Sequence, residues 1–63
     1  MDPKVEAHRQ ECMRLCRRLI NEIEQNKNDS ALIFGGDLNR KYISVANKAL
    51  DKTNRVLSKI KNI

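Results

Sequence analysis

The sequence has few of the residues that break helices or fill a large core. It contains two glycines, one proline, no tryptophan and only two aromatic residues, Phe34 and Tyr42. A chain of 63 residues makes one domain at most, with little interior. Scaffolds of this size usually need a disulfide, a metal or a partner chain to be stable. A partner chain is the simplest of these expectations here.

The sequence also lacks any long apolar run. No stretch of 18 apolar residues is present, so we expect no segment to span a membrane. The first four residues lack the apolar core of a signal peptide, which makes the cytoplasm the expected compartment. Reducing compartments disfavour disulfides, so Cys12 and Cys16 are expected to be thiols.

Motifs that carry catalysis are absent as well. No Ser/His/acid set, carboxylate pair or phosphate-binding loop is visible, and two helices offer no concave pocket, so we expect no enzyme. His8, Cys12 and Cys16 lie four residues apart and place three soft ligands on one helical face, and a dimer could supply six. Structural zinc needs four ligands, and the chain has no other Cys or His. We therefore expect no metal and no cofactor.

The segment Gly35-Gly36-Asp37 is the strongest turn signal in the chain. Glycine after a periodic run supplies the left-handed residue that ends a helix, and Asp37 can cap the next one. A stop signal followed at once by a start signal predicts a tight reversal. The predicted fold is all-α: one domain, residues 1–63, forming an antiparallel two-helix hairpin with helices at 3–34 and 38–62 and a turn at 35–37.

The first arm opens with Asp2 as the helix cap and Pro3 at the first helical position. Residues at spacings of three and four then predict one face of a helix: Val5, His8, Cys12, Leu15, Cys16, Leu19 and Ile23. The polar stretch 25–30 interrupts this pattern. Either the helix ends there and residues 31–34 form a separate segment, or it runs through to the glycines. We favour the continuous helix, because no Gly or Pro breaks the stretch and Phe34 returns in phase.

The second arm shows the same periodicity more clearly. Its stripe comprises Leu38, Tyr42, Val45, Ala46, Ala49, Thr53, Val56, Ile60 and Ile63. A second apolar row lies beside each stripe, formed by Met13, Ile20, Ile43, Leu50 and Leu57. Two facing helices bury one narrow stripe apiece, so a second row typically marks an association surface. A wide-stripe, loosely specified bundle is the alternative. Which row closes the hairpin and which binds a partner stays open.

Charge is distributed unevenly along the chain. Residues 1–34 are neutral, whereas residues 38–63 carry a net charge of +6, and the total is +5. One flank of the second arm forms a basic face, comprising Lys41, Lys48, Lys52, Arg55 and Lys59. Such a face fits an acidic partner surface or a phosphate backbone, or simply solvates a small protein. An RNA- or DNA-binding regulator built as a homodimeric four-helix bundle is therefore the alternative to a protein-binding module.

Residues 35–42, Gly-Gly-Asp-Leu-Asn-Arg-Lys-Tyr, followed by Ala49-Leu50, resemble the turn and second helix of small co-chaperones of type III secretion needle subunits. The resemblance covers residues 34–57. It implies a helical hairpin that binds a helical-repeat chaperone and helps keep the needle subunit soluble before export. It also implies that six residues face the chaperone: Tyr42, Val45, Ala49, Leu50, Val56 and Leu57. The basic second arm and the two cysteines depart from the family pattern.

Overall fold

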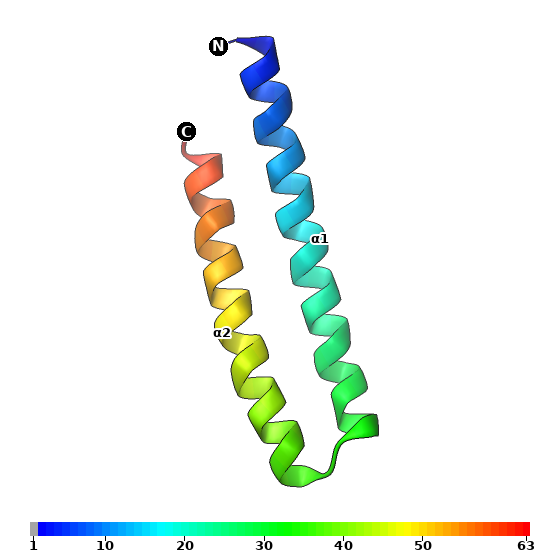
Figure 1. Ribbon diagram of the computed structural model, residues 1–63. Helices are drawn as coiled ribbons and strands as arrows, with labels where there is room; N and C mark the ends of the chain where they lie inside the picture. The colour runs from blue at the N-terminus through cyan, green and yellow to red at the C-terminus, as the bar shows by residue number, and fades with distance from the viewer. Residues whose placement is uncertain (1) are drawn as a thin grey trace.

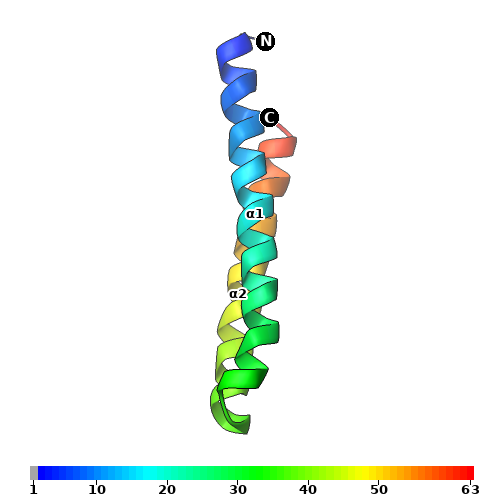
Figure 2. The same cartoon turned by 90° about the vertical axis from the view of Figure 1, so that its right-hand side faces the viewer.

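The computed structural model describes residues 2–63 as two long antiparallel α-helices joined by a short turn (Figure 1). Helix α1 spans Pro3–Ile33 and helix α2 spans Gly36–Lys61. The Cα atoms extend over 50 × 16 × 9 Å, so the molecule is a thin rod, seen edge-on in Figure 2. The predicted all-α hairpin is confirmed. At its open end α1 projects past the end of α2.

Helix α1 begins as the sequence predicts and continues without interruption. The Asp2 carboxylate accepts a hydrogen bond from the backbone N–H of Lys4 at 2.8 Å, and Pro3 opens the helix. Residues 25–30 are helical, which confirms the continuous helix. Within this stretch the Gln25 side chain donates to Asp29 one turn later at 3.2 Å, a local contact that supports polar residues in a helix.

The turn differs from the prediction, because its glycines are not left-handed. Phe34 has φ −105° and ψ 147°, and Gly35 has φ −73° and ψ 172°, so two extended residues reverse the chain. Within residues 2–63 no residue has positive φ. The cap assigned to Asp37 is also wrong: Gly35 occupies the cap position, and Gly36 is already helical. Asp37 lies in the first turn of α2, where its negative charge interacts favourably with the positive end of the helix dipole.

The two helices face each other along one row of residues on each. Positions in these rows recur at spacings of three and four, the heptad spacing of antiparallel coiled-coil packing. Every member is buried or half-buried: Glu6, Arg9, Met13, Cys16, Ile20, Ile23, Lys27 and Ser30 on α1, and Asn39, Ile43, Ala46, Leu50, Thr53, Leu57 and Ile60 on α2. We call these positions the inward rows.

Polar contacts fix the register of the inward rows. Ser30, only 2% exposed, lies with its hydroxyl 2.6 Å from Asn39 Oδ1 and 2.8 Å from the Lys27 carbonyl oxygen. Lys27 Nζ donates to Asn47 Oδ1 at 2.7 Å. At the open end the Arg9 guanidinium lies 3.5 Å from the Lys61 carbonyl oxygen. These contacts place residue 30 level with 39 and residue 9 level with the end of α2.

The buried core is very small. Only three hydrophobic side chains are buried within the described chain, Met13, Ala46 and Leu57, and none of them is fully enclosed. Near the turn, the Phe34 and Tyr42 rings lie 6.2 Å apart and tilted by 32°, within the range of favourable aromatic pairs. The hairpin therefore hides one narrow seam and leaves most of its apolar surface outside.

Candidate protein-binding surface

Each residue next to an inward position lies on one of two opposite faces of the hairpin. A helix turns by about 100° per residue. The residue immediately before each inward residue therefore points to one side of the hairpin, and the residue immediately after it points to the opposite side. Because the helices are antiparallel, the preceding residues of α1 and α2 lie on the same side. We call this side the apolar face and the other the polar face.

The apolar face carries large hydrophobic side chains along both helices. On α1 these include Leu15, 49% exposed, and Leu19, 46% exposed. On α2 Val45 is 67% exposed and Val56 is 48% exposed. The polar face carries, at the positions that follow inward residues, almost only charged and amide or hydroxyl side chains: Gln10, Arg14, Arg17, Asn21, Glu24, Asn28, Arg40, Ser44, Asn47, Asp51, Asn54, Ser58 and Lys61. The hairpin is therefore amphipathic as a whole.

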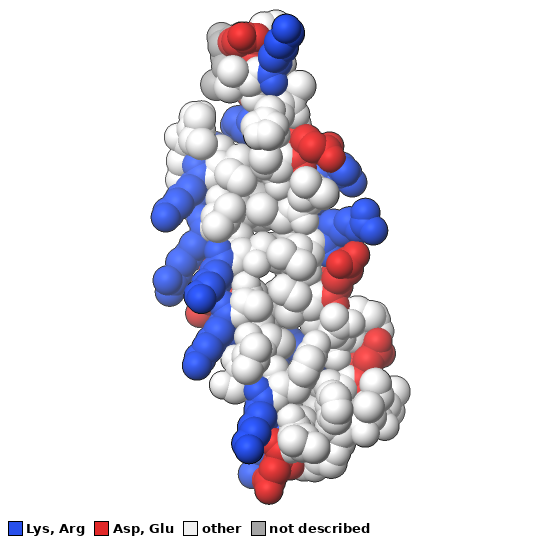
Figure 3. Space-filling view, in the orientation of Figure 1, with Lys and Arg blue, Asp and Glu red and all other residues white. Residues whose placement is uncertain are grey.

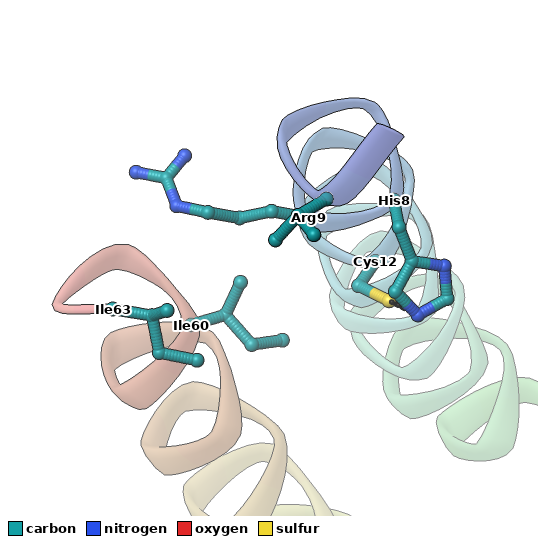
Figure 4. Close-up of a pocket in the computed structure, with 6 residues that line it drawn as sticks. His8, Arg9, Cys12, Ile60 and Ile63 are labelled. Carbon is teal, nitrogen blue, oxygen red and sulfur yellow. Dashed lines mark hydrogen bonds between the residues drawn. The ribbon is translucent and has the colours of Figure 1, made fainter. Parts of the chain in front are cut away.

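Two shallow hollows lie on the apolar face between the helices. The first, of ≈ 260 Å³, is lined by Val5, His8, Arg9, Cys12, Ile60 and Ile63. In Figure 4 the Ile60 and Ile63 side chains lie across from His8 and Cys12. The second hollow, of ≈ 190 Å³, is lined by Cys16, Leu19, Lys52, Thr53 and Val56. Both hollows are mostly apolar and draw residues from both helices.

A second group of exposed hydrophobic residues surrounds the turn. Leu32 is 87% exposed, Ile33 72%, and Leu38 60%. Figure 3 shows a band of uncharged side chains along the face turned to the viewer, with Lys and Arg along the α2 edge. Monomeric proteins rarely expose contiguous apolar surface of this kind unless it binds something. Exposed apolar side chains thus extend from the open end to the turn along α2, whereas Glu22, Asn26 and Asp29 interrupt them on α1.

Three arginines of α1 form ion pairs, whereas most of the cations of α2 form none among the described residues. On α1, three arginines pair with glutamates of the same helix: Arg9 with Glu6, Arg14 with Glu11 and Arg18 with Glu22. On α2 the single ion pair within the described residues joins Arg40 and Asp37 at 3.9 Å. The predicted basic face, Lys41, Lys48, Lys52, Arg55 and Lys59, is exposed and has no ion pair within residues 2–63.

The Glu11–Arg14 pair shifts the pKa values of both side chains. The Arg14 guanidinium donates hydrogen bonds to the Glu11 carboxylate, and this contact lowers the pKa of Glu11 and raises the pKa of Arg14. A carboxylate held in this way stays charged at neutral pH. The charge of α1 is therefore neutralised locally, and the excess positive potential of the molecule belongs to α2.

His8 and Cys12 line the first hollow, and Cys16 lines the second. Cys12 and Cys16 are free and half-buried, and Cys12 Sγ lies 3.6 Å from His8 Nε2. Within the described residues no three His, Cys, Asp or Glu side chains gather closely enough to hold a metal ion. Cys12 therefore lies on the apolar face within hydrogen-bond distance of His8, and Cys16 lies in the inward row as a small side chain of the seam.

The seam combines residues from both of the apolar rows that the sequence separates, because Cys16, Ile23, Ala46, Thr53 and Ile60 of the stripes also lie in the inward rows. Met13 and Leu57 are buried between the helices, and Ile20, Ile43 and Leu50 are half-buried there. The sequence leaves open which row closes the hairpin, and in the structure all five residues of the second row, Met13, Ile20, Ile43, Leu50 and Leu57, contribute to the seam. The other four residues predicted to bind a partner lie on the apolar side, with Tyr42 and Ala49 half-buried and Val45 and Val56 exposed.

Sequence reasoning placed several residues of the apolar face inside the hairpin. Val5, Leu15, Leu19, Leu38 and Ile63 belong to the apolar stripes of the sequence, and in the structure all five are exposed. The signal that could identify them is the pair of polar residues Ser30 and Asn39, whose contact across the turn fixes which row faces inward.

Comparison of the chain with protein-family models, curated proteins and solved structures gave no match. Within residues 2–63 no helix combines the length and the apolar character needed to cross a membrane.

Proposed function

We propose that the chain is a non-enzymatic adaptor that completes its core on a helical partner protein in the cytoplasm. One observation carries this proposal: large hydrophobic side chains line one face of the hairpin, while among residues 2–63 only three hydrophobic side chains are buried inside it. Full burial of a Val, Leu or Ile side chain contributes roughly 1.5–3 kcal/mol. Leu15, Leu19 and Val56 are each about half exposed, so a partner that covers them would add apolar burial that the lone hairpin lacks.

The resemblance at residues 34–57 gives the proposal a sharper form. The partner would be the helical-repeat chaperone of a type III secretion needle subunit, and the chain would help keep that subunit soluble before export. Four of the six residues that the resemblance assigns to the chaperone contact lie on the apolar face: Tyr42, Val45, Ala49 and Val56. The remaining two, Leu50 and Leu57, lie in the inward row and would act by holding the hairpin closed.

Co-expression with the candidate chaperone tests the proposal. We expect a hetero-complex that is stable in sedimentation equilibrium and melts at a higher temperature than either protein alone. Val56→Asp should abolish the complex, because a carboxylate would be buried against apolar surface. Asn54→Asp is the matched control: it changes the charge by the same amount on the polar face and should leave the complex intact.

Two results would contradict the adaptor. One is a tight homodimer that binds no chaperone, since the apolar face would then be satisfied by a second copy. The other is a complex that tolerates Val56→Asp as well as it tolerates Asn54→Asp, since the partner would then bind elsewhere.

A second candidate is favoured by the unpaired cations of α2. A basic regulator of RNA or DNA, built as a homodimeric four-helix bundle, would cover the apolar face with a second copy and place the basic face against phosphates. Binding should then weaken steeply with added salt, and Lys48→Glu with Arg55→Glu should abolish it. Absent or salt-independent binding of nucleic acid removes this candidate.

A further inference from the structure

We propose that the occupant of the apolar face is a single amphipathic helix of the partner, with acidic side chains along the edge that lies over α2. This inference rests on the proposed adaptor function and adds the chemistry and orientation of the bound segment. Three features of the hairpin carry it: the spacing of the two hollows, the position of the unpaired cations, and the absence of any open strand edge among residues 2–63.

The apolar face repeats with the period of a helix. Cys12 in the first hollow and Leu19 in the second are seven residues apart on α1. Ile63 and Val56 are seven residues apart on α2. Seven residues of helix span about 10.5 Å, so a partner helix with apolar residues at heptad spacing can place one in each hollow.

A helix also satisfies its own backbone. The hairpin offers no row of free N–H and C=O groups, because both of its elements are helices whose hydrogen bonds are internal. An extended segment would therefore lie on this face without hydrogen-bond partners for its backbone. An amphipathic helix needs only apolar contact and shape, which the hollows between α1 and α2 provide.

The charges give the bound helix an orientation. Lys52 lines the second hollow, and Lys59, seven residues later, also precedes an inward residue. Both lie on the α2 border of the apolar face, are exposed and have no ion pair within the described chain. On α1 the arginines that pair with acids do so locally. Lys52 and Lys59 thus attract acidic side chains of the partner helix at the α2 border alone. The acidic edge of the bound helix therefore lies over α2.

A second copy of this chain fits the same face less well. Each copy carries a net charge of +5 and the same unpaired cations, so face-to-face pairing would bring like charges together. The glutamates Glu6, Glu11 and Glu22, which could offset them, already pair with arginines. An acidic helix removes this repulsion and covers the apolar face in the same step.

Two synthetic helices test the orientation and the charge. Both carry leucine at heptad spacing; one has glutamates along a single flank, and the other has lysines at the same positions. Titration of the labelled helices with the purified chain at low salt should show about tenfold tighter binding of the glutamate helix, and the difference should shrink with added salt.

Charge reversal on the hairpin provides the matched control. Lys52→Glu with Lys59→Glu should make the lysine helix the tighter binder. Arg17→Glu with Lys61→Glu carries the same change in net charge, but both residues follow inward positions and lie on the polar face. This control should preserve the preference for the glutamate helix.

The outcomes separate this inference from the adaptor itself. If the chaperone binds through Val56 but both synthetic helices bind equally well, the acidic helix is wrong and the adaptor stands. If neither helix binds and Val56→Asp leaves the chaperone complex unchanged, both proposals fail. Tighter binding of a short DNA duplex than of the glutamate helix, lost with Lys52→Glu and Lys59→Glu, would overturn the acidic helix in favour of nucleic acid.

Discussion

At the scale of single residues, Gly36 carries the clearest consequence. It is the first residue of α2, its φ is negative, and a Cβ added there would meet nothing within 4 Å. Glycine in a helix loses more backbone entropy on folding than alanine does. The turn therefore gains no conformational benefit from glycine at this position.

We expect Gly36→Ala to stabilise the hairpin by about 0.5–1 kcal/mol, because it restricts the unfolded chain without straining the folded one. Thermal unfolding followed by circular dichroism measures the change. A left-handed glycine at position 36 would instead make the same substitution destabilising by about 1–2 kcal/mol. A lower melting temperature would thus contradict a helical Gly36.

At the scale of the helices, chemically similar residues differ in what they hold together. Leu57 is 8% exposed in the inward row, and Leu15 is 49% exposed on the apolar face. The leucine side chain therefore contributes to hairpin closure at position 57, whereas at position 15 it remains available to a partner.

Leu57→Ala and Leu15→Ala form a matched pair that tests this assignment. We expect Leu57→Ala to destabilise the lone hairpin by about 2 kcal/mol, the lower end for a buried leucine because the seam is narrow. Leu15→Ala should change its stability by less than about 0.5 kcal/mol. Urea unfolding of the two variants at the same protein concentration measures the difference. Equal losses would mean that both rows close the hairpin.

The elements were predictable from the sequence, and the row that joins them was not. Asp2 and Pro3 mark the start of α1, and the lack of Gly or Pro in residues 25–30 indicates its continuity. Both apolar rows, however, have the same spacing of three and four. The inward row of α1 contains Arg9 and Lys27, and hydrophobicity alone therefore ranks it lower. Contacts across the seam, such as Ser30 with Asn39, decide the choice, and they depend on register rather than on local pattern.

At the scale of the whole molecule, positive charge is concentrated on one helix. Residues 38–63 carry seven basic side chains and one acidic one. Several of the basic residues lie four apart, as Lys48 and Lys52 do, where like charges repel along a helix. The lone hairpin is therefore destabilised by its own electrostatic field.

Added salt should stabilise the lone hairpin, because screening weakens repulsion along α2 more than it weakens the exposed ion pairs of α1. We expect a gain of a few tenths of a kcal/mol between low and physiological ionic strength, since exposed charge pairs contribute roughly that much each. Melting temperature at several concentrations of sodium chloride measures this gain. Lys48→Gln should reduce the dependence, and a melting temperature that falls with salt would show that the local ion pairs dominate.

The contrast between the apolar and polar faces has a consequence for assembly. In a stack of helical repeats each internal unit packs against a neighbour on two sides, and the terminal unit needs one polar side that is exposed to solvent. A hairpin with charged, amide and hydroxyl side chains along one side can join such a stack only at its end. It would cap the stack. One hairpin would bind at an end, and its polar face would leave no apolar surface on which a further copy could bind.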